Sequence, residues 1–268
     1  MKIVLFTSNT KGALNTFNIK TLIKNCPNHN YIIVNLNNKP KRIGNWLKFK
    51  RFIVELRDGK DYWRRDLKSL EKKIIQSFPK VNLKKIKTYQ VSSVNGELTE
   101  QIIKESSPDI VIQAGAGILK ENIFSIPKYG TLNVHHGFAP EIRGIKSTYW
   151  CLHYGLHNLI GVTCHYIDKT LDTGPVIKQY RYNYNPSTSF IDIQLDLCKN
   201  GAKILTESVN EIEKSKDWHL DKKEIKSYYF SGVSPKDYNK LKAQNFLPIS
   251  DKSELKYKIK IKSTLKPN

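Results

Sequence analysis

The chain has 268 residues, of which 39% are hydrophobic and 10% aromatic, so the composition supports a packed core and argues against general disorder. No apolar run reaches the roughly 18 residues that a membrane span requires, so no span is expected. The formal net charge of +21 predicts attraction to polyanions or phosphorylated substrates. No zinc-finger, RNA-recognition or basic-zipper pattern accompanies that charge, so specific nucleic-acid binding is not expected.

The first part of the chain alternates between buried-strand and helix patterns. Apolar runs at 2–8 and 31–36 flank a helical pattern at 13–25, which is the order of a βαβ unit and predicts a parallel sheet. A helical pattern at 96–107 leads into the clearest central strand, 108–117, which ends in a loop of small residues. These elements together predict an α/β chain with a mostly parallel sheet.

Residues 39–87 interrupt this alternation with two helical patterns, NWLKFKRFIVELR and YWRRDLKSLEKKII. Both are rich in aromatic and basic residues. We interpret the segment as a basic helical insertion that either borders a pocket or only covers an edge of the sheet.

The second part of the chain predicts a strand, a short helix with Ser147 as its N-cap, two more strands and a long amphipathic helix. The period-two run YKIKIK near the C-terminus suits an edge strand whose lysines face water. We therefore expect one large Rossmann-like unit over 1–215, with a twisted sheet and helices on both faces, and a short C-terminal extension over 216–268. The five elements lie at 130–136, 147–156, 160–168, 175–183 and 187–214.

The stretch TLNVHHG places Asn133 and His135 two residues apart at the end of an apolar strand. Side chains two apart on a strand project from the same face, and ligands of open parallel sheets bind at the carboxyl ends of the strands. An amide beside an imidazole offers a donor for a developing oxyanion and a group that moves protons near neutral pH. His136 should face the opposite way, and we assign it to packing.

A carboxylate is needed to orient the imidazole, and YIDKTLDTGP supplies two candidates, Asp168 and Asp172. Asp172 lies in a turn immediately before an apolar strand, which should hold it firmly. Asn, His and Asp without a serine or cysteine nucleophile indicate direct acyl transfer to an amine, with no covalent enzyme intermediate.

LNVHHGFAPEIRG resembles the Asn-x-His…Pro-x-x-Arg-Gly signature of the folate-dependent formyltransferases, and YIDKTLDTGPVI resembles their Asp-x-x-x-Asp-x-Gly-Pro loop. The order and spacing of the two segments also match, as does AGAGILKENIFSIPKYG before the signature. The resemblance covers roughly 109–177. Two departures stand out: His136-Gly137 replaces the proline usual after the histidine, and Gly117 stands where some members carry a larger polar residue.

The resemblance implies that 1–215 is a catalytic domain whose formyl donor is N10-formyltetrahydrofolate, with no metal. It assigns Asn133 and His135 to polarising the formyl oxygen and Asp172 to orienting His135 and relaying protons. The donor's pterin would be held largely by the backbone of two loops, comprising Ala116, Gly117, Ile118, Leu119, Ile167, Asp168, Lys169 and Thr170.

Three acceptor amines are known for the family: glycinamide ribonucleotide, initiator methionyl-tRNA and nucleotide-linked amino sugars. The tail after about residue 214 is too short for the five-stranded barrel of the tRNA enzymes, and YYFSG resembles the tails of sugar N-formyltransferases. We therefore expect a dTDP- or UDP-linked 4-amino-4,6-dideoxy sugar, made for a surface polysaccharide such as the lipopolysaccharide O-antigen. Methionyl-tRNA and glycinamide ribonucleotide remain alternatives. A non-catalytic polyanion-binding protein on this core is the alternative of another class.

Candidate acceptor contacts are Ser8, Asn9 and Thr10 after the first strand, together with Arg143 and Trp150. The four cysteines lack paired spacing, which is typical of reduced thiols in a cytoplasmic protein. A metal site built from the nearby histidines and cysteines is not favoured, because neither a CxxC pair nor an acidic partner appears. A homodimer through the tyrosine-rich YRYNYN segment and the tail is left open.

Overall fold

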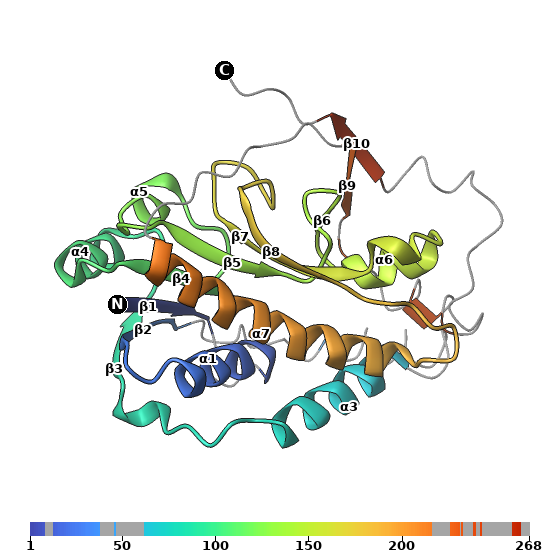
Figure 1. The fold of residues 1–268 in the computed structure, drawn as a ribbon, viewed down its shortest axis with the longest axis horizontal. Coiled ribbons are helices and arrows are strands. Elements are labelled where there is room, and N and C mark those ends of the chain that lie inside the picture. The colour runs from blue at the N-terminus through green and yellow to red at the C-terminus, as the bar shows by residue number, and fades with distance from the viewer. Residues whose placement is uncertain are drawn as a thin grey trace.

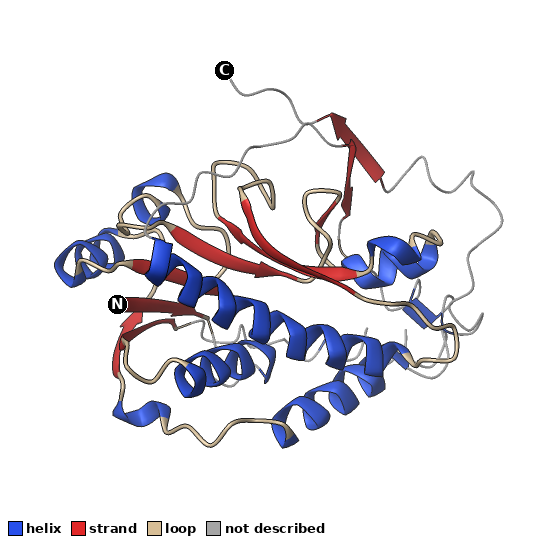
Figure 2. Cartoon of the chain, in the orientation of Figure 1, coloured by secondary structure: helices blue, strands red, loops and turns tan. Residues whose placement is uncertain are grey.

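A computed structural model describes residues 1–8, 13–37, 46, 62–215, 226–230, 232, 238–239, 242 and 259–263 (Figures 1 and 2). These residues form a seven-stranded sheet in the order β3-β2-β1-β4-β5-β7-β8 and a three-stranded sheet in the order β10-β9-β6. The strands are β1 (Lys2–Thr7), β2 (Asn30–Leu36), β3 (Lys87–Val91), β4 (Ile110–Ala114), β5 (Thr131–His135), β6 (Ile142–Gly144), β7 (Gly161–Tyr166), β8 (Val176–Arg181), β9 (Lys226–Phe230) and β10 (Ile259–Ser263).

Helices cover both faces of the larger sheet (Figure 1). The described helices are α1 (Ala13–Asn25), α3 (Tyr62–Gln76), α4 (Glu97–Ser106), α5 (Glu121–Phe124), α6 (Ser147–His153) and α7 (Phe190–Ser215), with 3-10 turns η1 (Leu83–Lys85) and η2 (His157–Leu159). Among the described strands of this sheet, β7 alone is antiparallel to the other six, since it pairs antiparallel with both β5 and β8.

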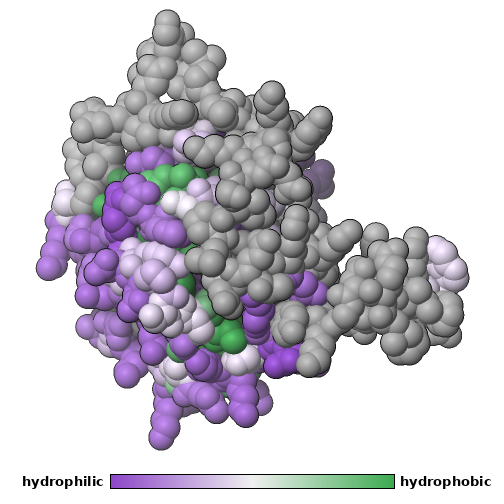
Figure 3. Space-filling view, turned by 90° about the vertical axis from the view of Figure 1, so that its right-hand side faces the viewer, coloured by the Kyte–Doolittle hydropathy of each residue, from purple (hydrophilic) through white to green (hydrophobic). Residues whose placement is uncertain are grey.

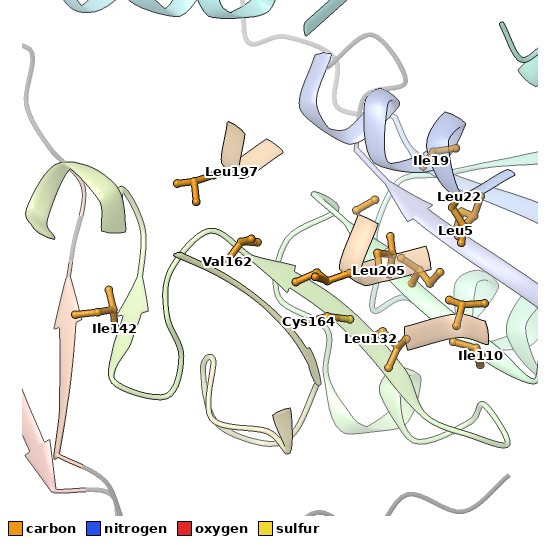
Figure 4. Close-up of a cluster of buried hydrophobic side chains, with 14 of the residues drawn as sticks. Leu5, Ile19, Leu22, Ile110, Leu132, Ile142, Val162, Cys164, Leu197 and Leu205 are labelled. Carbon is orange, nitrogen blue, oxygen red and sulfur yellow. The ribbon is translucent and has the colours of Figure 1, made fainter. Parts of the chain in front are cut away.

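The core follows from the alternation of side chains along the central strands. On β1, Ile3 and Leu5 face one side and pack with α1 and α7, whereas Val4 and Phe6 face the other side and pack with α4. All four are fully buried, as expected of a parallel strand covered on both faces. Figure 4 shows the larger cluster, in which Leu205 of α7 lies among residues of α1 and the sheet.

The smaller sheet joins the tail to the main unit. β9 pairs parallel with β6 and antiparallel with β10, so a strand of the extension lies directly beside Arg143 and Gly144. Phe230 at the end of β9 is buried against Trp150 and Tyr154 of the α6 region. The surface shown in Figure 3 is mostly hydrophilic where described, with apolar residues confined to small patches. No described helix has the length and apolar character needed to cross a membrane.

The mostly parallel α/β fold is confirmed, as are helices at 13–25, 62–76 and 97–106 and a strand for the YKIKIK run. Strand β3 was missed, because its exposed alternate residues carry no clear pattern at the end of the assigned insertion 39–87. The NWLKFKRFIVELR segment lies outside the described residues except Trp46. The N-cap prediction for Ser147 was wrong: Lys146, in a left-handed conformation, is the N-cap, and Ser147 is the first helical residue.

Candidate active site

Asn133 and His135 lie on β5, near the carboxyl ends of β1 and β4. Strand periodicity places both side chains on one face, as the sequence predicted. Across the antiparallel pair with β7, Asn133 is opposite His165 and His135 is opposite Thr163. The register of this strand pair therefore makes a second histidine, His165, the cross-strand neighbour of the Asn133 amide.

The tautomer of His135 is set by the backbone. Its Nε2 lies 3.0 Å from the carbonyl oxygen of Ile142. Since a carbonyl can only accept, Nε2 carries the proton. The other ring nitrogen, Nδ1, lies 3.5 Å from Oδ2 of Asp172, which is longer than a good hydrogen bond. A proton on Nδ1 would turn the ring into an imidazolium paired with Asp172.

His165 orients the amide of Asn133. The Nδ2 of Asn133 lies 3.2 Å from Nε2 of His165, and Nδ1 of His165 lies 2.8 Å from the Tyr166 carbonyl. Nδ1 must donate to that carbonyl, so Nε2 accepts from the amide and the ring is neutral. Burial lowers the pKa of His165, and the nearby His135 acts in the same direction. Within the described residues, the Asn133 amide makes no second hydrogen bond.

Asp172 reaches the two histidines from the loop between β7 and β8. Its Oδ2 accepts a 2.9 Å hydrogen bond from the Gly144 backbone, and its Oδ1 lies 3.8 Å from Nε2 of His165. The residue has φ of 54°, a left-handed conformation that Asp and Asn tolerate better than most. Gly174 lets the loop double back, because a Cβ there would lie 1.8 Å from the Tyr166 carbonyl oxygen. The Asn133, His135 and Asp172 side chains thus converge, with His165 between the amide and the carboxylate.

Comparison with known proteins identifies the family of the chain. Residues 62–209 match the family model described as formyl transferase, which is more than half of the chain. The chain belongs to the formyl transferase family.

Individual proteins of known sequence or structure match different fractions of this formyl transferase. A methionyl-tRNA formyltransferase of Kosmotoga olearia is 33% identical over 128 residues, which are 47% of this chain and 41% of that protein. The match therefore spans less than half the length of this curated relative.

Solved structures share the fold at low identity. A sugar N-formyltransferase from Shewanella sp. FDAARGOS_354 has a TM-score of 0.57 at 12% identity, covering 91% of this chain and 87% of that one. A phosphoribosylglycinamide formyltransferase from Bacillus halodurans has a TM-score of 0.55 at 13% identity, covering 81% and 97%.

The two loops that the family resemblance assigns to the pterin, 116–119 and 167–170, lie side by side in this formyl transferase. Ile167 packs in the same core cluster as Ala116 and Leu119, and Lys169 forms a 3.0 Å ion pair with Glu121, which follows the first loop. Asp168 organises the second loop internally, accepting hydrogen bonds from the Thr170 backbone and from the Thr173 hydroxyl. Direct contacts of these residues with a donor stay a prediction.

A cavity of about 520 Å³ is bordered by the candidate catalytic residues Asn133 and His135. It is lined by Asn133 and His135, by the segment 144–149, and by parts of α1, α3 and the start of α7. Leu67, Leu70 and Ile74 of α3 face it at helical spacing and form an apolar wall. The described part of the basic insertion therefore borders a pocket, which was one of the two interpretations of that segment.

The structure places the predicted acceptor contacts in different surroundings. Trp150 is 1% exposed and stacks within the aromatic cluster of α6 and β9, so the indole does not reach the cavity, contrary to the prediction. Arg143 is buried and donates to the Leu171 carbonyl over 3.4 Å, which supports the loop that carries Asp172. Ser8 donates to the Gly115 carbonyl and so braces the loop that follows β4. Asn9 and Thr10 lie outside the described residues.

His136 and Gly137, the departures from the usual signature, have structural reasons. His136 is partly buried and lies against Gly201 of α7, where a Cβ would sit 3.8 Å from its Nε2, and its ring also borders the cavity. Position 137 has no room for a side chain, because a Cβ on Gly137 would lie 2.3 Å from Nε2 of His135. A larger residue after His136 would displace the catalytic imidazole.

His136 predicts a loss of stability in mild acid. Burial, with His135 acting in the same direction, lowers the pKa of His136 to about 4 from 6.5. The unfolded chain therefore binds a proton that the folded chain excludes between pH 6.5 and 4, so stability is full above pH 6.5 and falls as the pH drops through this window. We expect this group to remove about 2 kcal/mol between pH 7.5 and 5. Urea unfolding at both pH values should show a smaller loss for His136→Gln than for the wild type, and equal losses would contradict the assignment.

Proposed function

We propose that this formyl transferase moves the formyl group of N10-formyltetrahydrofolate to the primary amine of a nucleotide-linked amino sugar. The observation that carries the proposal is the convergence of Asn133, His135 and Asp172 at the edge of a cavity of about 520 Å³, the size of a small-molecule site. The product would be an N-formyl amino sugar for a surface polysaccharide.

The pterin loops suit a flat, partly apolar donor. Ile118 on the first loop is 71% exposed and Leu171 on the second is 38% exposed, so each loop presents a large apolar side chain to solvent. Gly117 has φ of 97°, and a Cβ there would meet no atom within 4 Å, so the backbone beside it is open to a ligand. The bound donor would supply the one-carbon unit that is transferred.

The residues of the site divide the chemistry between them. Negative charge develops on the formyl oxygen when the amine attacks, and the free amide proton of Asn133 and a proton on Nδ1 of His135 would stabilise it. Asp172 would hold His135 as an imidazolium, take the proton that the amine loses and pass it to the departing nitrogen. His165 would keep the amide of Asn133 in the donating orientation.

Two observations support an amino sugar as the acceptor. The cavity combines an apolar wall on α3 with polar groups from β5 and α6, which suits a deoxy sugar better than a purely charged ligand. The sugar N-formyltransferase of known structure also shares the fold over most of both chains. The basic charge of the chain would favour the diphosphate of a nucleotide sugar.

Methionyl-tRNA is the second candidate acceptor, because a methionyl-tRNA formyltransferase is 33% identical over part of this chain and the net charge of +21 also suits an RNA. One panel separates the candidates. The protein is incubated with N10-formyltetrahydrofolate and, separately, with dTDP- and UDP-linked 4-amino-4,6-dideoxy sugars, charged initiator tRNA and glycinamide ribonucleotide, while tetrahydrofolate release is followed.

We expect turnover with at least one amino-sugar nucleotide, with kcat/KM at least about 100-fold above the other acceptors, because a site built for hydrogen-bonding groups rejects ligands that lack them. Turnover confined to charged tRNA or to glycinamide ribonucleotide would overturn the proposed acceptor. Absence of turnover with every amine would overturn the activity itself and favour a polyanion-binding role.

A further inference from the structure

Ser147 and Asn18 each have a buried polar atom without a hydrogen-bond partner among the described residues, and they line two adjoining cavities. Ser147 is 1% exposed and its Oγ has no hydrogen-bond partner in the described part of the chain. Asn18 of α1 is 7% exposed, and its Oδ1 likewise lacks a partner among the described residues. Buried polar atoms without partners are uncommon, since each forfeits its hydration.

The two residues line neighbouring cavities. Ser147 lines the cavity of about 520 Å³, and Asn18 lines an annex of about 160 Å³ beneath α1. Leu14, Asn15, Asn133 and Val134 line both cavities, so the two cavities adjoin beside β5. The Ser147 hydroxyl is also close to the imidazole, because a Cβ at Gly137 would lie 2.3 Å from Nε2 of His135 and 2.8 Å from Oγ of Ser147.

The surroundings of these atoms decide what ligand would satisfy them. Apart from its asparagines and Gln113, the annex is lined mainly by apolar residues such as Leu5, Leu22 and Ile112, which provide neither charge nor donors. The Gln113 amide is already used, donating to the Gly117 carbonyl and accepting from the Gly115 backbone. A ligand group that donates to Oδ1 of Asn18 and exchanges a hydrogen bond with the Ser147 hydroxyl is a neutral hydroxyl or amine.

We propose that Ser147 and Asn18 bind the acceptor beside the reacting amine, each through a hydroxyl of its sugar nucleotide. The inference rests on the proposed function and names specificity-determining residues for it. Both groups are paired only when the acceptor is bound, so the folded protein holds them unsatisfied in its free state. A substrate whose amine is flanked by alkyl groups alone would leave both atoms buried without partners and would bind poorly.

Ser147→Ala makes this inference testable, because binding and structural roles predict opposite effects on stability. Removing an unpartnered buried hydroxyl should leave the Tm of the free protein unchanged or raise it. It should also weaken binding of the amino-sugar nucleotide by about 3- to 10-fold, measured by calorimetry without donor, and raise the acceptor KM to a similar extent. The KM for N10-formyltetrahydrofolate should not change. Ser147→Thr, which keeps the hydroxyl, should retain most of the affinity.

The matched controls come from the same chain and the same chemistry. Ser215→Ala removes a hydroxyl that donates to the Glu211 carbonyl at the far end of α7, and we expect no change in either KM. Asn18→Ala should lower acceptor affinity by a similar factor with the donor KM unchanged. Acceptor analogues that each lack one sugar hydroxyl complete a double-mutant cycle. One analogue should bind the wild type about 3- to 10-fold more weakly than the full acceptor does. The Ser147→Ala variant should bind this analogue and the full acceptor with equal affinity.

Two results would overturn the inference, and both are distinct from failure of the proposed function. If the wild type turns over amino-sugar nucleotides but Ser147→Ala and Asn18→Ala bind them unchanged, the two residues do not contact the acceptor. If Ser147→Ala lowers the Tm without changing acceptor binding, the hydroxyl is structural. The proposed function fails instead when the wild type turns over no amino-sugar nucleotide.

Discussion

Asn133→Ala should lower kcat by about 100- to 1,000-fold while the protein remains folded. The amide has a free proton at the reacting position, and its other proton is held by Nε2 of His165 at 3.2 Å. Alanine removes the oxyanion donor but leaves the strand pairing of β5 intact, since that pairing uses the backbone. The measurement is tetrahydrofolate release at saturating donor and acceptor, together with a thermal unfolding curve.

The control for this change is Asn35→Ala. Asn35 is on β2 of the same sheet, opposite Thr7, the last residue of β1, and its amide donates to Gln90 rather than to any residue of the site. We expect kcat of the control to stay within about 2-fold of the wild type. The oxyanion role of Asn133 is wrong if its alanine variant keeps more than about a tenth of the wild-type kcat.

Asp172→Asn should lower kcat by about 100- to 10,000-fold, the range expected for loss of a group that moves protons. The carboxylate lies 3.5 Å from Nδ1 of His135 and would stabilise the imidazolium that donates to the formyl oxygen. Asparagine removes the charge but can still accept from the Gly144 backbone, and it tolerates the φ of 54° at this position. Stability should therefore be nearly unchanged.

Asp172→Ala separates catalysis from folding at the same position. Alanine leaves the Gly144 N–H without its acceptor and tolerates a positive φ poorly, so its Tm should fall as well as its kcat. Asp192→Asn is the matched control, because Asp192 pairs with Lys73 at 2.6 Å on the surface, where ion pairs contribute little. The assignment of Asp172 would be wrong if Asp172→Asn retained as much activity as Asp192→Asn.

Much of the site could be predicted because its chemistry lies in two short segments. Asn133 and His135 share a strand, and strand periodicity alone puts them on one face. Asp172 was recognised from its turn residues and its place before a strand. His165 was missed although a visible signal existed, a histidine on the strand that leads into the Asp172 loop. Its role depends on the register between β5 and β7, which no local pattern encodes.

The errors share the same physical origin. Trp150 carries an aromatic ring that suits a nucleotide base, but packing against Phe230 from a distant strand buries it. Ser147 has the ideal chemistry for an N-cap, yet the chain enters α6 through a left-handed Lys146 and leaves the hydroxyl facing the cavity side. Strand β3 forms because β2 offers a partner for its backbone, whatever its exposed side chains.

The sequence by itself determined the alternating α/β architecture, the strand that bears the amide and imidazole, and the carboxylate that completes them. These features depend on periodicity and turn chemistry within a few residues. Tertiary structure alone decided that His165 orients Asn133, that α3 walls the cavity of about 520 Å³, and that Ser147 and Asn18 lie unpaired, among the described residues, in this cavity and its neighbour. Such features depend on strand register and on helix packing between residues far apart in the chain, where one shift would point each side chain elsewhere.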